Sequence, residues 1–458
     1  MRVRGGQQPN RFPTIHGAET RRSYGDGSTG QSGLAGRAVG IALAMLLAGF
    51  AVVDAGELVD FVARADPSIR WLKRSEREIG TVREIDAELV SQTWRGVVWR
   101  HELRVVVPSR PAASDLAVLV VGGDGAHGPI DERRLAEDTG VITSYLRSVP
   151  NQPLFGASED ALIAFSFEQY LRTNDADWPL LFPMTKAAAT AMDAISALVG
   201  GAYEVRRFVV TGASKRGWTS WLAAVADPRV TAIAPMVFDN LDFAAQMKNQ
   251  MAVWGQYSNM LGDYTERRLQ ALIGTERGRV LVSMVDPFTY RATLARVSKL
   301  VVNGSNDPYW DVGAVDLYWN DLDGPKALVC VPNAGHDAGS DARSEAALVE
   351  LVRRTAGRRV MPELSTSGDG QRATIRSDEA PRRVLIWRTE SASRDLRSAR
   401  WRAAEARPEG DQFLVDVVPA ADRYAAWFAE AEYASSGHSF TLSTPVRILA
   451  PQAIERSQ

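Results

Sequence analysis

The sequence Phe208-Val-Val-Thr-Gly-Ala-Ser-Lys-Arg-Gly-Trp218 predicts a buried strand that runs directly into a helix. Its β-branched residues favour an extended backbone, and the alanine-rich residues 220–226 that follow favour a helix. Gly212 and Gly217 permit a tight turn between them. Ser214 lies at the corner, where its hydroxyl would stand above the end of a parallel sheet as a nucleophile. The alternative is an ordinary turn in which this serine caps the helix.

Strand and helix patterns alternate on both sides of this corner. Wholly apolar runs indicate parallel strands that are covered on both faces, and the alternation with helices predicts an α/β fold with right-handed crossovers. Residues 85–107, where apolar residues recur at every second position, predict an antiparallel hairpin before that sheet. The other expected strands are residues 116–121, 141–145, 208–211, 230–237, 299–303 and 327–331, and the expected helices are residues 57–65, 135–139, 185–199, 220–226 and 342–354.

Two segments depart from this alternation. Residues 240–285 are rich in Gln, Asn, Met and aromatic residues, which indicates a helical cap inserted into an α/β-hydrolase domain at residues 56–359. After residue 359 the chain carries several short runs with alternating apolar residues. They predict a separate β-sandwich domain at residues 360–458.

The N-terminal segment has the organisation of an export signal. Residues 1–37 are rich in Gly, Ser, Gln and Arg and are expected to be disordered. The apolar run at residues 38–53 would form a helix of roughly 24 Å, shorter than the roughly 30 Å hydrocarbon core. Because small residues follow in Val53-Asp-Ala55, we expect cleavage rather than a permanent anchor. The mature protein would then be secreted or periplasmic, without a stable membrane span.

Composition excludes several classes of function. A chain of 458 residues exceeds the usual size of one domain, and its net charge of −2 gives no case for nucleic-acid binding. The single cysteine, Cys330, excludes an intrachain disulfide and lies in an apolar run as an expected core thiol. The sequence contains no paired-cysteine, paired-histidine or phosphate-binding glycine motif, so we expect neither a metal nor an organic cofactor.

A serine nucleophile needs a general base, and histidine suits this role because imidazole titrates near neutral pH. His336 follows the last expected strand, where the α/β-hydrolase order of serine, acid and histidine places the base. Asp307 follows the preceding strand and is the expected acid. Asp239, at the end of residues 230–237, is the alternative acid, and Asp311 is a more distant one.

The oxyanion would be bound by backbone amides on two loops. One is the amide of Lys215, directly after the serine, and the other lies near Gly123, in the glycine-rich loop after residues 116–121. A cation beside the nucleophile would stabilise the oxyanion or attract an acidic substrate. The candidate substrate-binding residues are Arg216, His127, Trp218 and Trp310.

The corner departs from the usual G-x-S-x-G pattern, since Arg216 occupies the second position after the serine and Gly217 comes one residue later. It is similar to the G-x-S-R-x-G pattern of glucuronoyl esterases, with Lys215 in place of the arginine. This resemblance covers only a hexapeptide.

A longer set of segments resembles the PhoPQ-activated pathogenicity-related protein family, over roughly residues 57 to 450. The resemblance implies an exported α/β-hydrolase-like protein with a C-terminal β domain, and it implies little about the substrate. Family members are also associated with secreted signalling roles. The segments are Ser91-Gln-Thr-Trp94, Trp99-Arg-His-Glu-Leu103, Thr211-Gly-Ala-Ser-Lys-Arg-Gly-Trp218, Asp227-Pro-Arg-Val230, Asp286-Pro-Phe-Thr-Tyr290, Asn306-Asp-Pro-Tyr309 and Pro332-Asn-Ala-Gly-His336.

We therefore expect a serine hydrolase that cleaves a small-molecule or glycan carboxylic ester through an acyl-enzyme. A serine peptidase differs only in the acyl group attacked and stays an alternative. The other alternative is a non-catalytic binding or signalling protein, for which Ser214 and His336 would lie beyond hydrogen-bond reach. The sequence does not define an oligomeric state.

Overall fold

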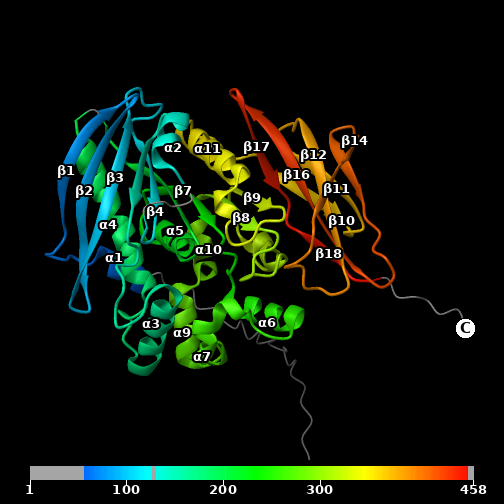
Figure 1. Ribbon diagram of the computed structural model, residues 1–458, viewed down its shortest axis with the longest axis horizontal. Coiled ribbons are helices and arrows are strands. Elements are labelled where there is room, and N and C mark those ends of the chain that lie inside the picture. Colours follow the sequence, from blue (N-terminus) through cyan, green and yellow to red (C-terminus); the bar gives the residue numbers. More distant parts are fainter. Residues whose placement is uncertain (1–55, 126–129, 202, 452–458) are drawn as a thin grey trace, which may run out of the picture. The chain divides into compact units, whose positions relative to one another are not determined.

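A mostly parallel sheet organises the first part of the molecule in the computed structural model, which describes residues 56–125, 130–201 and 203–451 (Figure 1). Its strands are β1 (Arg70–Ile79), β2 (Val82–Trp94), β3 (Val97–Pro108), β4 (Leu116–Val121), β5 (Ile142–Leu146), β6 (Arg207–Ala213), β7 (Val230–Met236), β8 (Ser298–Gly304) and β9 (Lys326–Val331). They lie in the order β1-β2-β3-β5-β4-β6-β7-β8-β9. The first three are antiparallel and β5 to β9 are parallel, so the predicted α/β-hydrolase core is confirmed.

Helices cover both faces of this sheet, which explains why its central strands are apolar throughout. Leu116, Val118 and Val120 of β4 face the core beneath α2 (Glu132–Thr139) and α11 (Ala342–Ala356). The alternate residues of β4 face the opposite core, beneath α1 (Gly56–Ala63), α4 (Leu181–Val199) and α5 (Lys215–Ala226). All six β4 side chains are at most 2% exposed.

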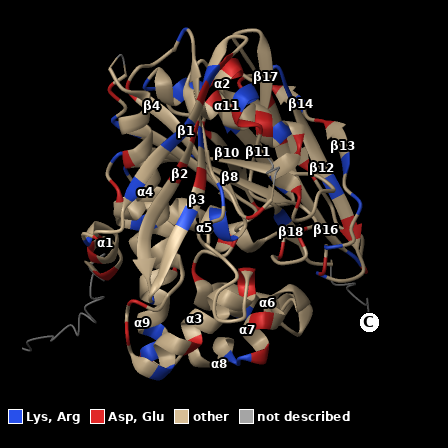
Figure 2. Ribbon diagram, turned by 60° about the vertical axis from the view of Figure 1, so that its left-hand side comes forward, with Lys and Arg blue, Asp and Glu red and all other residues tan. Residues whose placement is uncertain are grey.

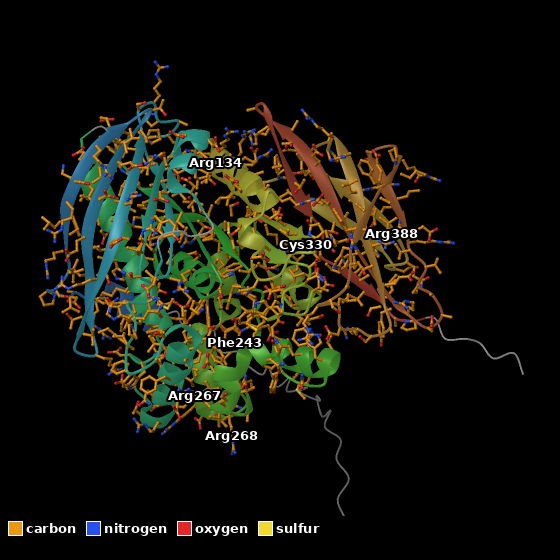
Figure 3. All side chains as sticks on the ribbon, in the orientation of Figure 1. Arg134, Phe243, Arg267, Arg268, Cys330 and Arg388 are labelled. Atoms are coloured by element: carbon orange, nitrogen blue, oxygen red, sulfur yellow. The ribbon has the colours of Figure 1, made fainter. Side chains whose placement is uncertain are left out.

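A group of helices, called the cap helices below, gathers beyond one end of the sheet (Figure 1). They are α3 (Glu159–Thr173), α6 (Phe243–Trp254), α7 (Gly262–Glu266), α8 (Leu269–Leu272) and α9 (Glu276–Val285), followed by the short α10 (Arg291–Leu294). The predicted helical insertion is thus present, and both signs of charge occur on it (Figure 2). Phe243 lies on the side toward the sheet, whereas Arg267 and Arg268 lie at the outer end (Figure 3).

α3 and β1 are among the elements that the sequence did not predict. α3 begins at Glu159, in a stretch for which no helix was expected, and its buried residues lie on more than one face, so no single apolar stripe marks it. β1 is an edge strand with mostly exposed, charged side chains. Backbone pairing with β2 holds it in place, and this pairing leaves no alternating pattern in the sequence.

The C-terminal part forms two antiparallel sheets. One follows the order β17-β16-β12-β13, and the other β10-β11-β15-β14. Side chains from both, including Ile375, Val415, Ile386 and Trp427, share one core, as expected for a sandwich. The strands are β10 (Leu364–Gly368), β11 (Arg372–Ser377), β12 (Arg383–Ser391), β13 (Arg402–Glu405), β14 (Arg407–Glu409), β15 (Gln412–Asp416), β16 (Tyr424–Ser435), β17 (His438–Ser443) and β18 (Arg447–Leu449).

The two parts are joined more closely than two independent domains would be. β17 continues the central sheet by pairing with β9 through Ser443 and Leu328. The described residues all belong to one compact unit, Val52–Gln458. A domain boundary near residue 360 therefore stays a prediction.

Residues 1–55, with the predicted export signal, lie outside the described ranges. Within those ranges, no helix combines the length and the apolarity that crossing a bilayer requires.

Arg354 of α11 forms a buried ionic link between the first part of the molecule and the C-terminal part. Its Nε donates to Glu350 Oε1 at 2.6 Å, and its guanidinium also pairs with Glu379, just before β12. The Arg354 and Glu350 side chains are 5% and 0% exposed. Removing one partner of such a pair leaves a buried charge without compensation.

We predict that Arg354→Met lowers the free energy of unfolding by about 3–5 kcal/mol, because the buried Glu350 carboxylate would lose its guanidinium partner. Urea unfolding followed by circular dichroism measures the change. Arg407→Met is the control, because the Arg407 side chain is 75% exposed and its ion pair spans 4.0 Å. It should change stability by less than about 0.5 kcal/mol. Equal effects of both variants would contradict the buried link.

Candidate active site

The backbone at Ser214 has an unusual conformation. Ser214 joins β6 to α5 with φ 57° and ψ −125°, outside the regions that non-glycine residues ordinarily occupy. Its amide donates to Met236 O at 2.8 Å, and its carbonyl accepts from Trp218 N at 3.0 Å. The side chain makes no capping hydrogen bond, so the alternative of a simple helix cap is not what the structure shows. The hydroxyl is left available for other partners.

Close packing around two glycines maintains this conformation. A Cβ atom on Gly212 would lie 2.8 Å from Val121 O of β4. A Cβ atom on Gly217 would lie 2.9 Å from Met236 O of β7. The first turn of α5 therefore lies directly against the strand ends, and any side chain at these two positions would force the backbones apart. This contact explains why glycine occurs three residues after the serine.

Three strand ends bring Ser214, His336 and Asp307 together. His336, in the loop after β9, lies with Nε2 3.0 Å from Ser214 Oγ. Its Nδ1 lies 2.8 Å from Oδ2 of Asp307, which follows β8. In the tautomer with the proton on Nδ1, the imidazole donates to the carboxylate and accepts from the hydroxyl. The arrangement is a continuous hydrogen-bond chain from a buried carboxylate to a hydroxyl.

Tyr309 holds two members of this chain, a role that the sequence did not reveal. Its amide donates to Asp307 Oδ1 at 2.8 Å, which fixes the carboxylate. Its ring lies 4.2 Å from the His336 ring, measured between centroids. Tyr309 belongs to the segment Asn306-Asp-Pro-Tyr309, so that motif was the available signal.

The two alternative acids have other partners. Asp239 is 4% exposed and accepts from Tyr318 Oη at 2.7 Å. Burial, together with the nearby carboxylates of Asp307 and Asp311, raises the pKa of Asp239 to about 7 despite that hydrogen bond. Asp311 accepts from Asn249 at 3.1 Å. Asp307 is the carboxylate that contacts His336.

Of the other histidines, His101 does not contribute to this arrangement. His127, expected to line the pocket, lies outside the described residues. His101 is 2% exposed and lies between Ser91 Oγ and Arg147 O. Burial lowers the pKa of His101 to about 4. Within the described ranges, no group of three or more His, Cys, Asp or Glu side chains is arranged to hold a metal ion.

The amides expected to bind an oxyanion belong to the residue after the serine and to the loop after β4. Lys215 is the first residue of α5, so its amide has no acceptor within the helix. Gly123 follows β4, and its carbonyl accepts from Ser148 N at 3.1 Å. A Cβ atom on Gly123 would contact the Arg216 guanidinium, so Arg216 lies directly beneath this loop.

Both cations after the serine are paired with acids at the start of α3. Lys215 Nζ lies 2.8 Å from Glu159 Oε2 and 3.3 Å from Asp160 Oδ2. Arg216 donates twice to Glu159 at 2.6 Å and once to Val149 O at 2.5 Å. Burial raises the pKa of Glu159, but the hydrogen bonds and charges of Arg216 and Lys215 outweigh it and hold that pKa well below its usual range.

These contacts bear on the predicted role of Arg216 in substrate binding. Its guanidinium is already engaged by protein acceptors and does not line the cavity beside Ser214. The sequence did not reveal the partners Glu159 and Asp160, because they lie more than fifty residues away along the chain.

A predominantly apolar cavity opens beside Ser214, with an empty volume of about 870 Å³ that includes the part open to solvent. Ser214, Lys215 and Trp218 form one wall. Trp310, also predicted to bind substrate, and Tyr309 line it too, and the Tyr309 ring contacts that of His336. The remaining wall comes from the cap helices. The hydroxyl of Ser214 is thus reached from a cavity whose lining is mainly apolar.

The chain matches a known family over most of its length. Residues 58–397 match the family model described as PhoPQ-activated pathogenicity-related protein. Over 315 residues the chain is 31% identical to Autocrine proliferation repressor protein A of Dictyostelium discoideum. That match covers 64% of this chain and 63% of the relative, so the chain spans less than two thirds of the relative's length.

Solved structures with a similar chain trace include two esterases. Acetyl xylan esterase 1 from Thermoanaerobacterium sp. JW/SL YS485 matches with a TM-score of 0.47 and 16% identity, over 66% of this chain and 92% of that one. A glucuronoyl esterase from Solibacter usitatus matches with a TM-score of 0.43 and 12% identity, over 65% and 91%.

We predict that Gly217→Ala lowers the free energy of unfolding by about 1–3 kcal/mol, because the added methyl group would collide with the β7 backbone. The control is Gly262→Ala, since a Cβ atom on this helical glycine meets nothing within 4 Å. That variant should be neutral or up to about 1 kcal/mol more stable. Urea unfolding of both proteins measures the difference. A Gly217→Ala protein as stable as Gly262→Ala would refute the close contact.

Proposed function

The chain belongs to the PhoPQ-activated pathogenicity-related protein family, and we propose that it is a serine hydrolase that cleaves carboxylic esters through an acyl-enzyme. One observation carries the proposal: the hydrogen-bond chain from Asp307 through His336 to Ser214, with separations of 2.8 Å and 3.0 Å. This geometry, together with the unusual backbone conformation of the serine, supports an activated nucleophile.

The proposed acylation step begins when Ser214 Oγ attacks the ester carbonyl carbon. His336 Nε2 accepts the hydroxyl proton as the new C–O bond forms. The oxyanion that develops is stabilised by the amides of Lys215 and Gly123. The tetrahedral intermediate then collapses, and His336 returns the proton to the departing alcohol oxygen.

In deacylation, a water molecule takes the place of the alcohol. His336 accepts a proton from this water as its oxygen attacks the acyl carbon, and Ser214 regains a proton when the carboxylic acid leaves. Asp307 holds the imidazole in the required tautomer and stabilises the imidazolium. The Tyr309 amide, bound to the other carboxylate oxygen, keeps Asp307 oriented. No step requires a metal or an organic cofactor.

Export and domain organisation complete the proposal. The basic segment and apolar run within residues 1–55 support export to the periplasm or the outside of the cell. The C-terminal strands would form a second domain from about residue 360.

The two alternative functions make different demands on the same site. A non-catalytic signalling protein, a role suggested by the name of the Dictyostelium relative, needs no hydrogen bond between Ser214 and His336. The separation of 3.0 Å does not favour it. A serine peptidase would use the same residues, so it is distinguished by substrate alone.

We predict that the protein reacts with a fluorophosphonate probe and hydrolyses p-nitrophenyl acetate, and that Ser214→Ala abolishes both. The expected loss in kcat is at least about 10⁴-fold, because the nucleophile is absent. Ser283→Ala, which alters an exposed hydroxyl on α9, is the control and should react normally. A folded wild-type protein that neither reacts with the probe nor hydrolyses any ester or aminopeptide tested would contradict the proposal.

A second experiment identifies the acid. We predict that Asp307→Asn lowers kcat for p-nitrophenyl acetate by about 10⁴-fold, because the imidazole loses its preferred tautomer. Asp239→Asn should cost less than about tenfold, since Asp239 contacts Tyr318 rather than His336. The assignment of Asp307 is wrong if the Asp239 variant is the more impaired.

A further inference from the structure

We propose that the cavity beside Ser214 binds the acyl group of the substrate and that this group is a long apolar chain. The inference rests on the proposed ester hydrolysis and adds the chemical class of the substrate. Esters of fatty or other extended apolar acids would be cleaved in preference to acetyl esters or esters of charged acids.

The side chains that line the cavity are mostly apolar and suit a hydrocarbon chain. Phe167 of α3, Phe243 of α6 and Leu281 of α9 line it and are at most 7% exposed. Each comes from a different cap helix, so the cavity exists only because these helices assemble over the serine. A cavity lined in this way favours apolar ligands, because it offers dispersion contacts and displaces poorly bonded water.

The charges at the cavity wall are already neutralised. Lys215 Nζ is paired with Glu159 and Asp160, at 2.8 Å and 3.3 Å, and Asp160 also accepts from Tyr264 Oη at 3.1 Å. The other polar side chains that line the cavity, Ser214, Asn240, Gln270 and Tyr309, are uncharged. An acidic acyl group would therefore lose its hydration without gaining an unpaired cation.

The position of the base assigns the cavity to the acyl side of the ester. The departing alcohol oxygen must receive its proton from His336 Nε2, so the alcohol lies beside that ring. His336 is not among the residues that line the cavity, whereas Ser214 and Lys215, whose amide would bind the oxyanion, both line it. Tyr309 contacts the His336 ring and lines the cavity, so it forms the boundary between the two sides.

The test is a series of p-nitrophenyl esters from acetate to decanoate, in which the alcohol stays constant. We expect kcat/KM to rise about fourfold for each added methylene until the cavity is filled, which corresponds to about 0.8 kcal/mol. A second series, acetate esters of alcohols of increasing length, should show no such rise. A flat acyl series, or a rise confined to the alcohol series, would overturn the assignment.

Matched variants on one helix connect the effect to the cavity. Val282 of α9 lines it, whereas Val280 of the same helix is 42% exposed. We expect Val282→Phe to lower the ratio of octanoate to acetate activity at least about tenfold, since the ring occupies space for several methylenes. Val280→Phe should keep the wild-type ratio. An unchanged ratio in Val282→Phe would overturn the inference.

A binding measurement separates failure of this inference from failure of the proposed function. Decanoic acid is titrated into the Ser214→Ala protein while tryptophan fluorescence is recorded, because Trp218 and Trp310 line the cavity. If binding is saturable and Val282→Phe weakens it at least about tenfold, the cavity binds the apolar chain even if no ester is hydrolysed. A different result would be Ser214-dependent hydrolysis of acetate esters with no chain-length preference and no binding of decanoate. That result would refute the role of the cavity in acyl binding, and the proposed hydrolase function would stand.

Discussion

The backbone conformation of Ser214 is the constraint around which the site is built. A positive φ at a non-glycine residue is unfavourable and persists only where the surrounding structure over-determines it. Here the contact of α5 with the ends of β4 and β7 does so, and that contact requires Gly212 and Gly217. Because the serine is held above the sheet end, loops after β8 and β9 can present Asp307 and His336 to it within hydrogen-bond distance.

The two cations after the serine connect this corner to the cap helices. Lys215 and Arg216 pair with acids at the first turn of α3, which is also a wall of the cavity. The Lys215 and Arg216 side chains are 8% and 11% exposed and that of Glu159 is 41% exposed, so these partly buried pairs link α3 to the corner. The departure from G-x-S-x-G thus has a structural reason, because it places the Arg216 side chain under Gly123 and against Glu159.

Prediction from sequence succeeded where the signal was local. The apolar strands, the antiparallel hairpin and the glycine-flanked corner each result from residues within one short window, and the structure contains all three. It failed for β1, which is held by backbone pairing at a sheet edge, and for α3, which is buried on several faces. The partners of Lys215 and the contacts of Tyr309 were also missed, since neither leaves a pattern along the chain.

The order of serine, acid and histidine could be read from the amino-acid order, because strand ends and turns are specified by neighbouring residues. Which aspartate meets His336, whether Lys215 and Arg216 are free to bind substrate, and what lies beside Ser214 required the folded molecule. Asp239 and Asp307 both follow strands of the same sheet, and their hydrogen-bond partners differ, since Asp239 accepts from Tyr318 and Asp307 contacts Tyr309 and His336. Such contacts join segments far apart along the chain, so their geometry is established only when the helices and strands pack together.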